Sequence, residues 1–361
     1  MNKTKYQVIA DDLRNKILLK EYLPDEVIPS ELQLQEIYDV SRHTVREAIN
    51  LLVNEGYLRK KKGSGTYVDS NKPSNQMNHT TSKTIGVIIT YMSDYIFPDI
   101  VRGIERTLRK HGYSMMLAST GNDYAQEKLC LEQMIKQGVQ GLIVEPTKSN
   151  QFNPNIALYT SIRNNGIPVV MINANYEELD IPSIALNDVK SGFVAAEAVM
   201  EAGHKEILLV SKIDDLQGKL RMKGFFKACE KYKIDFNPDN ILTYTTETRL
   251  DVAEKVFDKL KHNPNITAIV GYNDQIVYQI ISLLNQYDIR IPEDISIVGN
   301  DHYIAQTINL IDLTTIEHPK EQLGMDAAEW VVEAVQTGKQ NDSIFYQPKL
   351  IPGSTVKSLN S

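Results

Sequence analysis

Apolar residues near the start of the chain recur with the period of an α-helix. Tyr6, Ile9, Leu13 and Ile17 are spaced by three or four residues, so they line one face of an amphipathic helix. Residues 58–68 have a different pattern, with strand-like ends around a glycine-containing turn. The head of the chain is therefore predicted to contain helices followed by a β-hairpin.

Capping residues mark two further helices in this head. Ser30 stands three residues before Gln33, which is the spacing of a capping box that opens a second helix. Ser41 is placed to cap a third helix, which we expect to end at Gly56. The apolar residues of this third helix share one arc of the helical wheel: Val45, Ala48, Ile49 and Leu52.

A polar stretch at residues 70–83 separates the head from a region with another pattern. It lacks apolar periodicity and contains Pro73 among Asn and Ser residues, so we interpret it as a flexible linker. Beyond it, β-rich runs alternate with helical segments, and their near-continuous hydrophobicity is typical of strands buried in parallel sheets. The runs lie at 85–92, 113–119, 141–146, 168–174, 206–211, 241–245, 267–273 and 295–300.

Composition narrows the class of protein. The first residues contain no apolar signal peptide, and no run of about 18 apolar residues occurs, so we expect a cytoplasmic protein without a membrane span. Cys130 and Cys229 are the only cysteines and form no CxxC pair, which argues against a disulfide framework or a cysteine-rich metal site.

The formal net charge of −7 by itself disfavours nucleic-acid binding, but the charge is not evenly distributed along the chain. Residues 1–70 contain eleven Lys or Arg and eleven Asp or Glu, so the remainder carries the whole acidic excess. Within residues 41–68, six basic side chains stand against two acidic ones. A local positive surface of this kind can bind phosphates on an otherwise acidic protein.

The third predicted helix presents basic residues at its start. Arg42, His43 and Arg46 fall outside the apolar arc, beside the positive end of the helix dipole. Such helices enter the DNA major groove, where an arginine can donate two hydrogen bonds to guanine. The alternative is a solvated basic face. The next segment favours DNA, because Arg59–Lys62 place four basic residues beside a turn that can reach phosphates or a minor groove.

The segment from Tyr6 to Val68 resembles the GntR-family winged helix. The resemblance is carried by Pro-Ser-Glu at 29–31, Val-Ser-Arg-x-Thr-Val-Arg at 40–46 and Gly-x-Gly-Thr-x-Val at 63–68. It implies that DNA is contacted by the second and third helices, the wing, and a basic residue before the first helix. These residues are Glu31, Arg42, His43, Thr44 and Arg46, with Lys62, Gly63 and Gly65 in the wing and Lys5 at a phosphate.

Residues 84–355 resemble the effector domain of the LacI/GalR family, which is itself similar to periplasmic sugar-binding proteins. Landmarks include Arg-Gly-Ile-Glu at 102–105, Tyr-Asn-Asp at 272–274 and Ser-Ile-Val-Gly-Asn-Asp at 296–301. The pairing with a GntR-type head, together with TYMSDYIFPDIVRGIE and GLIVEPTKS, resembles the arabinose-responsive repressors. The fold class is therefore expected to be α/β, with an N-terminal winged helix-turn-helix and a two-lobed periplasmic-binding-protein-like domain with parallel sheets.

The same resemblance implies a domain organisation. A DNA-binding domain is expected at 1–69, a flexible linker at 70–83, and an effector-binding and dimerisation domain at 84–361. The two lobes of the effector domain are expected at 84–186 with 319–339 and at 187–318 with 340–357, with hinges near 186–188, 317–320 and 339–343.

Polar residues follow several of the predicted strands: Tyr91, Glu145, Asn173, Asn273 and Asp301. Ligands of α/β sheets bind beyond the carboxyl ends of the strands, where these side chains would meet. A sugar requires several convergent donors and acceptors, because each hydroxyl desolvated without a partner costs about 1–3 kcal/mol. The alternative interpretation is that these side chains cap helices or turn loops.

Aromatic and basic residues complete the predicted sugar site. Tyr95 and Phe97 can cover the apolar face of a sugar ring, and Arg221 can donate two hydrogen bonds to vicinal oxygens. By the LacI/GalR resemblance, Arg221 clasps the ligand together with Asn273 and Asp301, and Phe97 forms an aromatic wall.

The resemblance also bears on four positions of the site, of which Asn173 and Glu145 already follow predicted strands. Asn173 occupies a position where the LacI/GalR family often has Asp. Glu145, Lys148 and Asp188 are added because the runs around them resemble the arabinose-responsive repressors. Lys148 can equally be a solvated loop charge, and Asp188 a helix cap.

Taken together, these patterns predict a ligand-controlled transcriptional repressor that binds double-stranded operator DNA as a homodimer. The resemblance implies that L-arabinose or a similar monosaccharide releases the DNA, without a cofactor or metal. Another sugar or a purine is the alternative ligand. We do not expect an enzyme, because no GxSxG or HExxH motif occurs, and the winged helix disfavours a sugar-transport protein.

Overall fold

The computed structural model describes residues 4–18, 21–61, 64–69, 83–92, 95–303 and 311–360. The chain divides into two compact units, residues 1–82 and 83–361. Nearly all of the predicted linker, residues 70–82, lies outside the described residues. Across the described ranges, no helix has both the length and the apolar character needed to cross a membrane.

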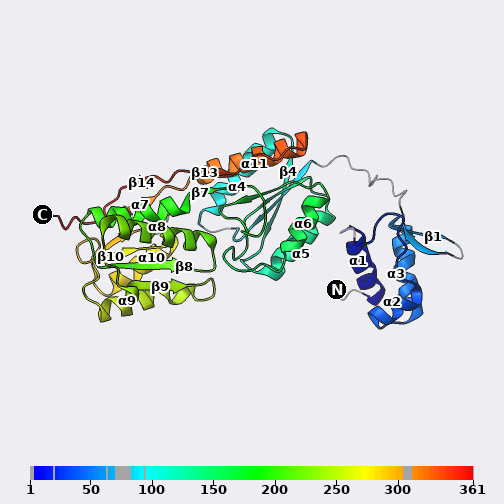
Figure 1. The fold of residues 1–361 in the computed structure, drawn as a ribbon, viewed down its shortest axis with the longest axis horizontal. Coiled ribbons are helices and arrows are strands. Elements are labelled where there is room, and N and C mark those ends of the chain that lie inside the picture. Colours follow the sequence, from blue (N-terminus) through cyan, green and yellow to red (C-terminus); the bar gives the residue numbers. More distant parts are fainter. Residues whose placement is uncertain are drawn as a thin grey trace. The chain divides into compact units, whose positions relative to one another are not determined.

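Unit 1 is built from helices and a hairpin around one small core (Figure 1). Ser30 and Gln33 form the predicted capping box, with the Ser30 amide donating to Gln33 Oε1 at 2.8 Å. Ser41 caps the third helix, and the apolar arc of that helix is buried as the pattern predicted. The elements are α1 (Lys5–Leu18), α2 (Glu31–Tyr38), α3 (Arg42–Asn54), β1 (Leu58–Lys61) and β2 (Gly65–Val68).

The first lobe of unit 2 contains a six-stranded parallel sheet in its described residues, in the order β13-β7-β6-β5-β3-β4. Helices α4 and α11 pack on one face, and α5 and α6 on the other (Figure 1). The strands are β3 (Thr84–Ile89), β4 (Ser114–Ser119), β5 (Gly141–Val144), β6 (Val169–Ile172), β7 (Ser183–Leu186) and β13 (Ile344–Tyr346). The helices are α4 (Phe97–Lys110), α5 (Tyr124–Lys136), α6 (Ile156–Asn164) and α11 (Lys320–Thr337).

The second lobe contains a four-stranded parallel sheet in the order β11-β10-β8-β9 within its described residues. One core lies between this sheet and α7 with α8, and another between the sheet and α9 with α10. The strands are β8 (Ile207–Lys212), β9 (Ile241–Tyr244), β10 (Ala268–Val270) and β11 (Ser296–Val298). The helices are α7 (Asp188–Glu201), α8 (Leu216–Tyr232), η1 (Pro238–Asn240), η2 (Arg249–Asp251), α9 (Val252–His262) and α10 (Asp274–Gln286).

The chain passes between the lobes after β7, after β12 (Thr315–Ile316), and between β13 and β14 (Leu350–Ile351). The third passage differs from the expected lobe boundary, because residues 340–357 do not all belong to the second lobe. β13 pairs with β7, with Ile344 beside Ile184, whereas β14 pairs with β12. The third crossing therefore lies after Tyr346 rather than at 339–343. Backbone pairing to β7 places this three-residue strand in the first lobe.

Helix α7 packs closely against α8. A Cβ at Gly192 of α7 would lie 2.0 Å from the backbone oxygen of Arg221 in α8, so only glycine permits this approach. The contact sets the Arg221 side chain beside the first turn of α7. The carboxyl ends of β8, β10 and β11 open at the same edge of the sheet.

Candidate ligand cleft and DNA-binding face

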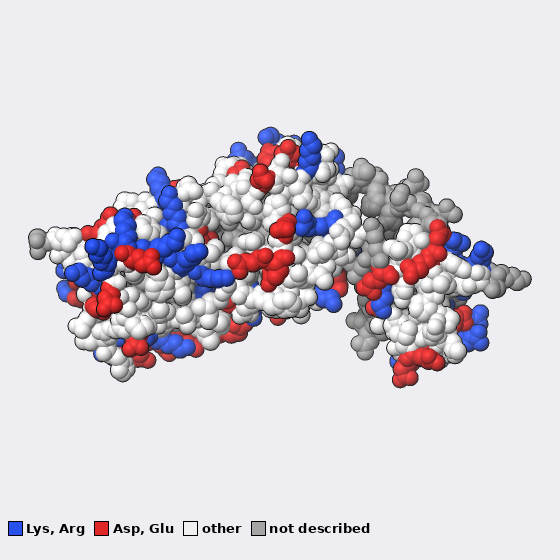
Figure 2. All heavy atoms as spheres, viewed as in Figure 1, with Lys and Arg blue, Asp and Glu red and all other residues white. Residues whose placement is uncertain are grey.

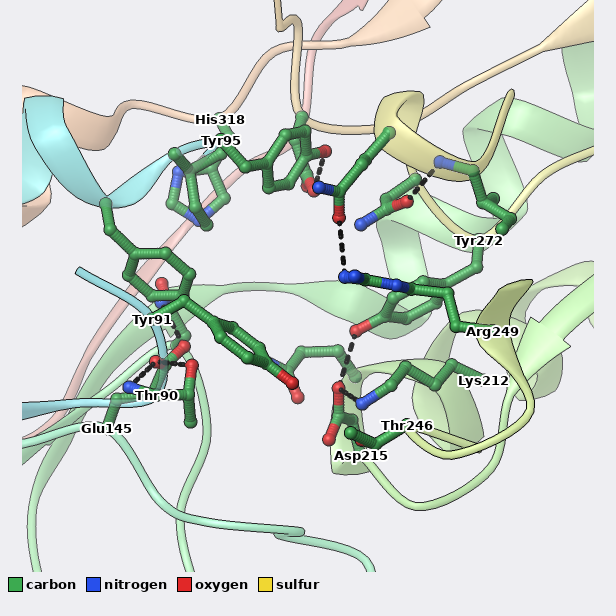
Figure 3. A pocket seen from close by; sticks show the side chains of 18 of the residues that line it. Thr90, Tyr91, Tyr95, Glu145, Lys212, Asp215, Thr246, Arg249, Tyr272 and His318 are labelled. Atoms are coloured by element: carbon green, nitrogen blue, oxygen red, sulfur yellow. Dashed lines mark hydrogen bonds and ion pairs between the residues drawn. The ribbon is translucent and has the colours of Figure 1, made fainter. Parts of the chain in front are cut away.

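A pocket in unit 2 is lined by side chains from both lobes (Figure 3). Its walls combine aromatic rings with carboxylates, amides and basic groups, a mixture suited to a small polar ligand with an apolar face. Seven of the nine predicted effector residues line it: Tyr95, Phe97, Glu145, Asn173, Asp188, Asn273 and Asp301. Arg221 does not line it, although it hydrogen-bonds two of the lining residues, Asp188 and Asp301.

Arg221 organises the wall that belongs to the second lobe. Its Nε donates to Asp188 Oδ1 at 2.7 Å, Nη1 to the Tyr272 carbonyl at 2.8 Å, and Nη2 to Asp301 Oδ1 at 3.0 Å. Arg221 is only 9% exposed, and both carboxylates are buried. Burial raises the pKa of Asp188 to about 6 despite the nearby Arg221. Three of the five guanidinium N–H groups thus hold the protein together, and the role of Arg221 includes fixing the two acids in place.

Asp301 connects the two lobes. Its Oδ2 accepts a hydrogen bond from the hydroxyl of Tyr95, in the first lobe, at 2.5 Å. Burial acts to raise the pKa of Asp301, but Arg221 and the other donors hold that pKa below its usual value. The Tyr95 ring also packs edge-on against Tyr303, with centroids 4.9 Å apart. Tyr95 is therefore a cross-lobe contact as well as a pocket wall.

Glu145 is a buried acid on the first-lobe side of the pocket. Its Oε2 accepts hydrogen bonds from the Thr90 amide at 2.9 Å and the Thr90 hydroxyl at 2.5 Å, and Asn173 Nδ2 donates to Oε1 at 2.9 Å. Burial raises the pKa of Glu145 to about 7, because these neutral donors compensate the charge only in part. This carboxyl therefore holds its proton to a higher pH than an exposed glutamate does.

Three buried polar atoms of pocket-lining residues have no hydrogen-bond partner among the described residues. They are Asn173 Oδ1, Gln217 Oε1 and His318 Nδ1. Burial lowers the pKa of His318 to about 4, so the ring is neutral at physiological pH. Buried polar atoms left without partners are costly, and in a pocket they mark the positions where a ligand supplies hydrogen bonds.

The structure adds pocket residues that the sequence pattern did not identify. Lys212, at the end of β8, donates to Asp215 Oδ2 at 2.5 Å, and the Tyr272 hydroxyl donates to the same oxygen at 3.2 Å. Thr246 and Arg249 follow β9 and line the same cavity (Figure 3). The rule that ligands bind beyond strand ends applies to β8 and β9 as well, so the signal was present in the sequence.

Two predicted residues have other or additional roles, and a third lacks the capping role that was its alternative. Lys148 does not line the pocket: its Nζ lies 2.6 Å from Glu247 Oε1, which joins the two lobes at an exposed position. Asn273 lines the pocket and also caps α10, because its Oδ1 accepts a hydrogen bond from the Ile276 amide at 3.0 Å. Asp188 is not the cap of α7, since Asn187 occupies that position.

Further polar contacts join the lobes beside the pocket. Asn122 Nδ2 donates to Thr246 Oγ1 at 2.7 Å. The Leu216 amide donates to Ser149 Oγ at 2.8 Å. Asn122 and Ser149 belong to the first lobe, and Thr246 and Leu216 belong to the second. These hydrogen bonds therefore hold the lobes together around the ligand site.

The DNA-binding face predicted on unit 1 is centred on the start of α3. Arg42 is 71% exposed and Arg46 59% exposed, and both approach Glu31, with N–O distances of 3.0 and 3.7 Å. His43 is exposed, whereas Thr44 is half-buried and takes part in the Ser41 cap. Figure 2 shows Lys and Arg atoms near the α3 and β1 edge of unit 1.

The hairpin beside α3 carries further basic side chains. Lys60 Nζ donates to Asn50 Oδ1 on α3 at 2.7 Å, so strand and helix present their polar groups together. Gly65 has φ of +125°, and a Cβ there would lie 3.1 Å from Val27 Cγ2, so the wing requires glycine. Lys5 is exposed at the start of α1. The predicted wing residues Lys62 and Gly63 lie outside the described residues.

Two protein-family models match the chain. Residues 5–68 match the bacterial regulatory proteins of the gntR family, and residues 82–351 match the periplasmic binding proteins and sugar binding domain of the LacI family. With the observed winged helix and paired parallel sheets, these matches confirm the predicted fold class.

Three known repressors are similar to this chain over most of its length. The arabinose metabolism transcriptional repressor of Halalkalibacterium halodurans is 42% identical over 96% of this chain and 95% of its own length. The repressor of the same name from Geobacillus stearothermophilus is 40% identical, with 98% of each chain covered. The HTH-type transcriptional repressor PurR of Vibrio parahaemolyticus is 26% identical over 78% of this chain and 83% of its own length.

Solved structures share the fold of unit 2. The LacI transcriptional regulator of Alkaliphilus metalliredigens in complex with D-xylulofuranose aligns with a TM-score of 0.66 at 24% identity, covering 76% of this chain and 99% of its own. The transcription regulator CcpA of Lactococcus lactis aligns with a TM-score of 0.67 at 21% identity, covering 76% of this chain and 100% of its own.

Proposed function

This chain belongs to the family of arabinose metabolism transcriptional repressors, and from that premise we propose that L-arabinose, bound in the cleft of unit 2, releases the protein from operator DNA. The family consists of repressors and not of enzymes. A repressor acts on chromosomal DNA, so we infer that the protein works in the cytoplasm.

The observation that carries the ligand assignment is the set of unpartnered buried atoms on pocket residues. Asn173 Oδ1 and Gln217 Oε1 accept hydrogen bonds only, and the neutral ring of His318 can accept or donate according to its tautomer. A monosaccharide presents hydroxyl groups that can both donate and accept. The Tyr91 and Phe97 rings, with centroids 6.3 Å apart, offer an apolar surface to the sugar ring.

We assign DNA recognition to the start of α3. The guanidinium groups of Arg42 and Arg46 are exposed and suited to the O6 and N7 acceptors of guanine. Glu31 holds both in place in the absence of DNA, and its carboxylate is suited to accept from the cytosine amino group. The wing, with Lys60, and Lys5 at α1 supply phosphate contacts.

We further propose a homodimer. The strand β4 is an edge of the six-stranded sheet in the described part of the chain, and its sequence SMMLAS leaves apolar side chains only partly buried. A long apolar edge strand is a ready surface for a second copy. Two DNA-binding heads would then reach two half-sites, which is the usual arrangement for helix-turn-helix readers.

Release follows from linkage. A ligand that binds the free repressor more tightly than the operator-bound repressor must weaken operator binding by the same factor. The contacts between Tyr95 and Asp301 and between Asn122 and Thr246 change when the lobes move, so lobe position is the element that both partners bias.

Fluorescence anisotropy tests this proposal directly. Full-length protein is bound to a labelled operator duplex and titrated with L-arabinose, D-xylose, D-ribose and hypoxanthine at fixed salt. We expect L-arabinose to lower the anisotropy at the lowest concentration. A response to hypoxanthine alone would favour the purine alternative, and an operator complex indifferent to every compound would overturn the proposal.

A further inference from the structure

We propose that Arg249, supported by Gln275, selects the ligand from the second lobe, and that the ligand it selects is an uncharged sugar with adjacent hydroxyl groups. This inference rests on the proposed sugar-binding function and deepens it, because it names a specificity residue and a ligand class.

The side chain of Arg249 lines the pocket, where a ligand can contact it. It begins η2, directly behind the loop after β9, and Figure 3 shows its side chain reaching into the pocket. It is half-buried, and Nη1 donates to Gln275 Oε1 at a long 3.4 Å. Among the described residues, no carboxylate lies within ion-pair distance of its guanidinium. Most of its five N–H donors therefore remain for a ligand.

Two other cations in or beside the pocket are already paired with carboxylates. Arg221 is bound to Asp188 and Asp301, and Lys212 lies 2.5 Å from Asp215. Their charged groups hold the walls in position, and their donors are largely used by the protein. Arg249 differs from both, because its hydrogen bond within the described part of the chain is to the neutral amide of Gln275, which can shift without leaving a charge unpaired.

The charge around the pocket decides which class of ligand Arg249 receives. A sugar acid or sugar phosphate requires net positive charge, since an anion is costly to desolvate without compensation. Here the acids are at least as numerous as the bases, even with Glu145 protonated. The acids are Asp188, Asp214, Asp215 and Asp301, and the bases are Lys212, Arg221, Arg249 and Lys320. The remaining donors of Arg249 are thus suited to two neutral oxygens in fork geometry.

The position of Arg249 in the chain also ties ligand selection to lobe closure. The loop immediately before it contains Thr246 and Glu247, which contact Asn122 and Lys148 of the first lobe. A sugar that hydrogen-bonds Arg249 orders the same segment that joins the lobes. An epimer that misplaces one hydroxyl would lose both the hydrogen bond and part of that ordering.

Isothermal titration calorimetry on the full-length protein tests the assignment. Arg249→Ala is expected to raise the Kd for L-arabinose about tenfold and to narrow the ratio of Kd values between D-xylose and L-arabinose. Arg249→Lys should recover only part of the loss, because an ammonium lacks the fork. Arg290→Ala is the matched control: Arg290 is an exposed arginine of the same lobe, paired with Asp294, and its loss should leave both sugars unaffected.

The outcomes separate this inference from the proposed function. If wild-type protein binds L-arabinose and Arg249→Ala binds it with unchanged Kd and selectivity, the role of Arg249 is wrong while the sugar function stands. If wild type prefers D-galacturonate to L-arabinose, the uncharged ligand class is wrong. If wild type binds no neutral sugar, the proposed function itself fails. The melting temperature of each ligand-free variant checks folding, and Gln275→Ala, which leaves the arginine in place, should weaken binding in the same direction.

Discussion

The hydroxyl of Tyr95 lies 2.5 Å from Asp301 Oδ2, and the two residues belong to different lobes. Asp301 is at the same time bound to Arg221, so one buried carboxylate receives hydrogen bonds from both sides of the cleft. Any movement of the lobes must break or rebuild this contact. The hydrogen bond between Tyr95 and Asp301 therefore couples ligand binding to the position of the lobes.

Tyr95→Phe removes the cross-lobe hydrogen bond and keeps the ring. We expect the Kd for L-arabinose to rise about tenfold, because hydrogen bonds to charged groups contribute about 1.5–3 kcal/mol and this one joins the two lobes beside the pocket. Calorimetry on the full chain measures it. Tyr287→Phe, on an exposed ring stacked against Phe257, is the control. Equal affinities for wild type and Tyr95→Phe would contradict a role in closure.

Glu145 should make the stability of the protein depend on pH. Burial raises its pKa from 4.5 to about 7, so the folded protein keeps a proton that the unfolded chain releases. The stability that the protonated Glu145 carboxyl contributes is therefore fully present below about pH 4.5. It is lost as the pH rises from there through about 7, and the free energy of unfolding falls by roughly 3 kcal/mol in all.

Glu145→Gln is expected to remove that dependence. Asn173 can rotate its amide to present Oδ1, which has no hydrogen-bond partner in the described part of the chain, to the new amide group. Urea denaturation at pH 5 and pH 8 measures the difference between wild type and variant, in which the shared contributions of other buried acids cancel. A difference that stays constant between the two pH values would show that Glu145 does not titrate in this window.

Arg42→Ala is expected to relax sequence recognition. If Arg42 contacts guanine, its loss costs about 1–3 kcal/mol at one operator position and leaves other positions unchanged. Lys60→Ala, by contrast, should weaken binding to all sequences. It should also reduce the slope of the logarithm of the binding constant against the logarithm of the salt concentration by about one. Anisotropy titrations against single-base operator variants distinguish the two. A uniform loss for Arg42→Ala would identify it as a phosphate contact.

Arg221→Ala is expected to destabilise the protein before it affects sugar binding. Its removal leaves Asp188 and Asp301 buried without their cation, which costs about 3–5 kcal/mol. Arg290→Ala, which removes an exposed ion pair, should change stability by about 0.5 kcal/mol or less. Chemical denaturation measures both. Similar stabilities for the two variants would mean that Arg221 serves the ligand and not the fold.

Local patterns in the sequence predicted much of this architecture. The capping box of Ser30 and Gln33 and the buried arc of α3 involve residues a few positions apart, so the chain alone specifies them. The strands β3 to β6 and β8 to β11 follow predicted apolar runs. The strands β7 and β13 were missed, and their pairing with each other joins segments that lie far apart in the chain.

The site shows the same division. Strand ends identified Glu145, Asn173 and Asp301, and resemblance added Arg221, but only the folded chain assigned their partners. Lys148 was expected at the ligand and instead pairs with Glu247 across the lobes. Arg249 carries no motif that distinguishes it from any exposed arginine of the sequence.

The sequence by itself determined the periodicity of the elements, their caps, the division into a DNA-binding head and an α/β sensor, and the family. The tertiary structure alone decided which charges are paired, which buried atoms have no partner, and where the chain crosses between lobes. The reason is physical: caps and amphipathic faces arise from neighbours in the chain, whereas burial and ion pairing arise from residues that only folding brings together.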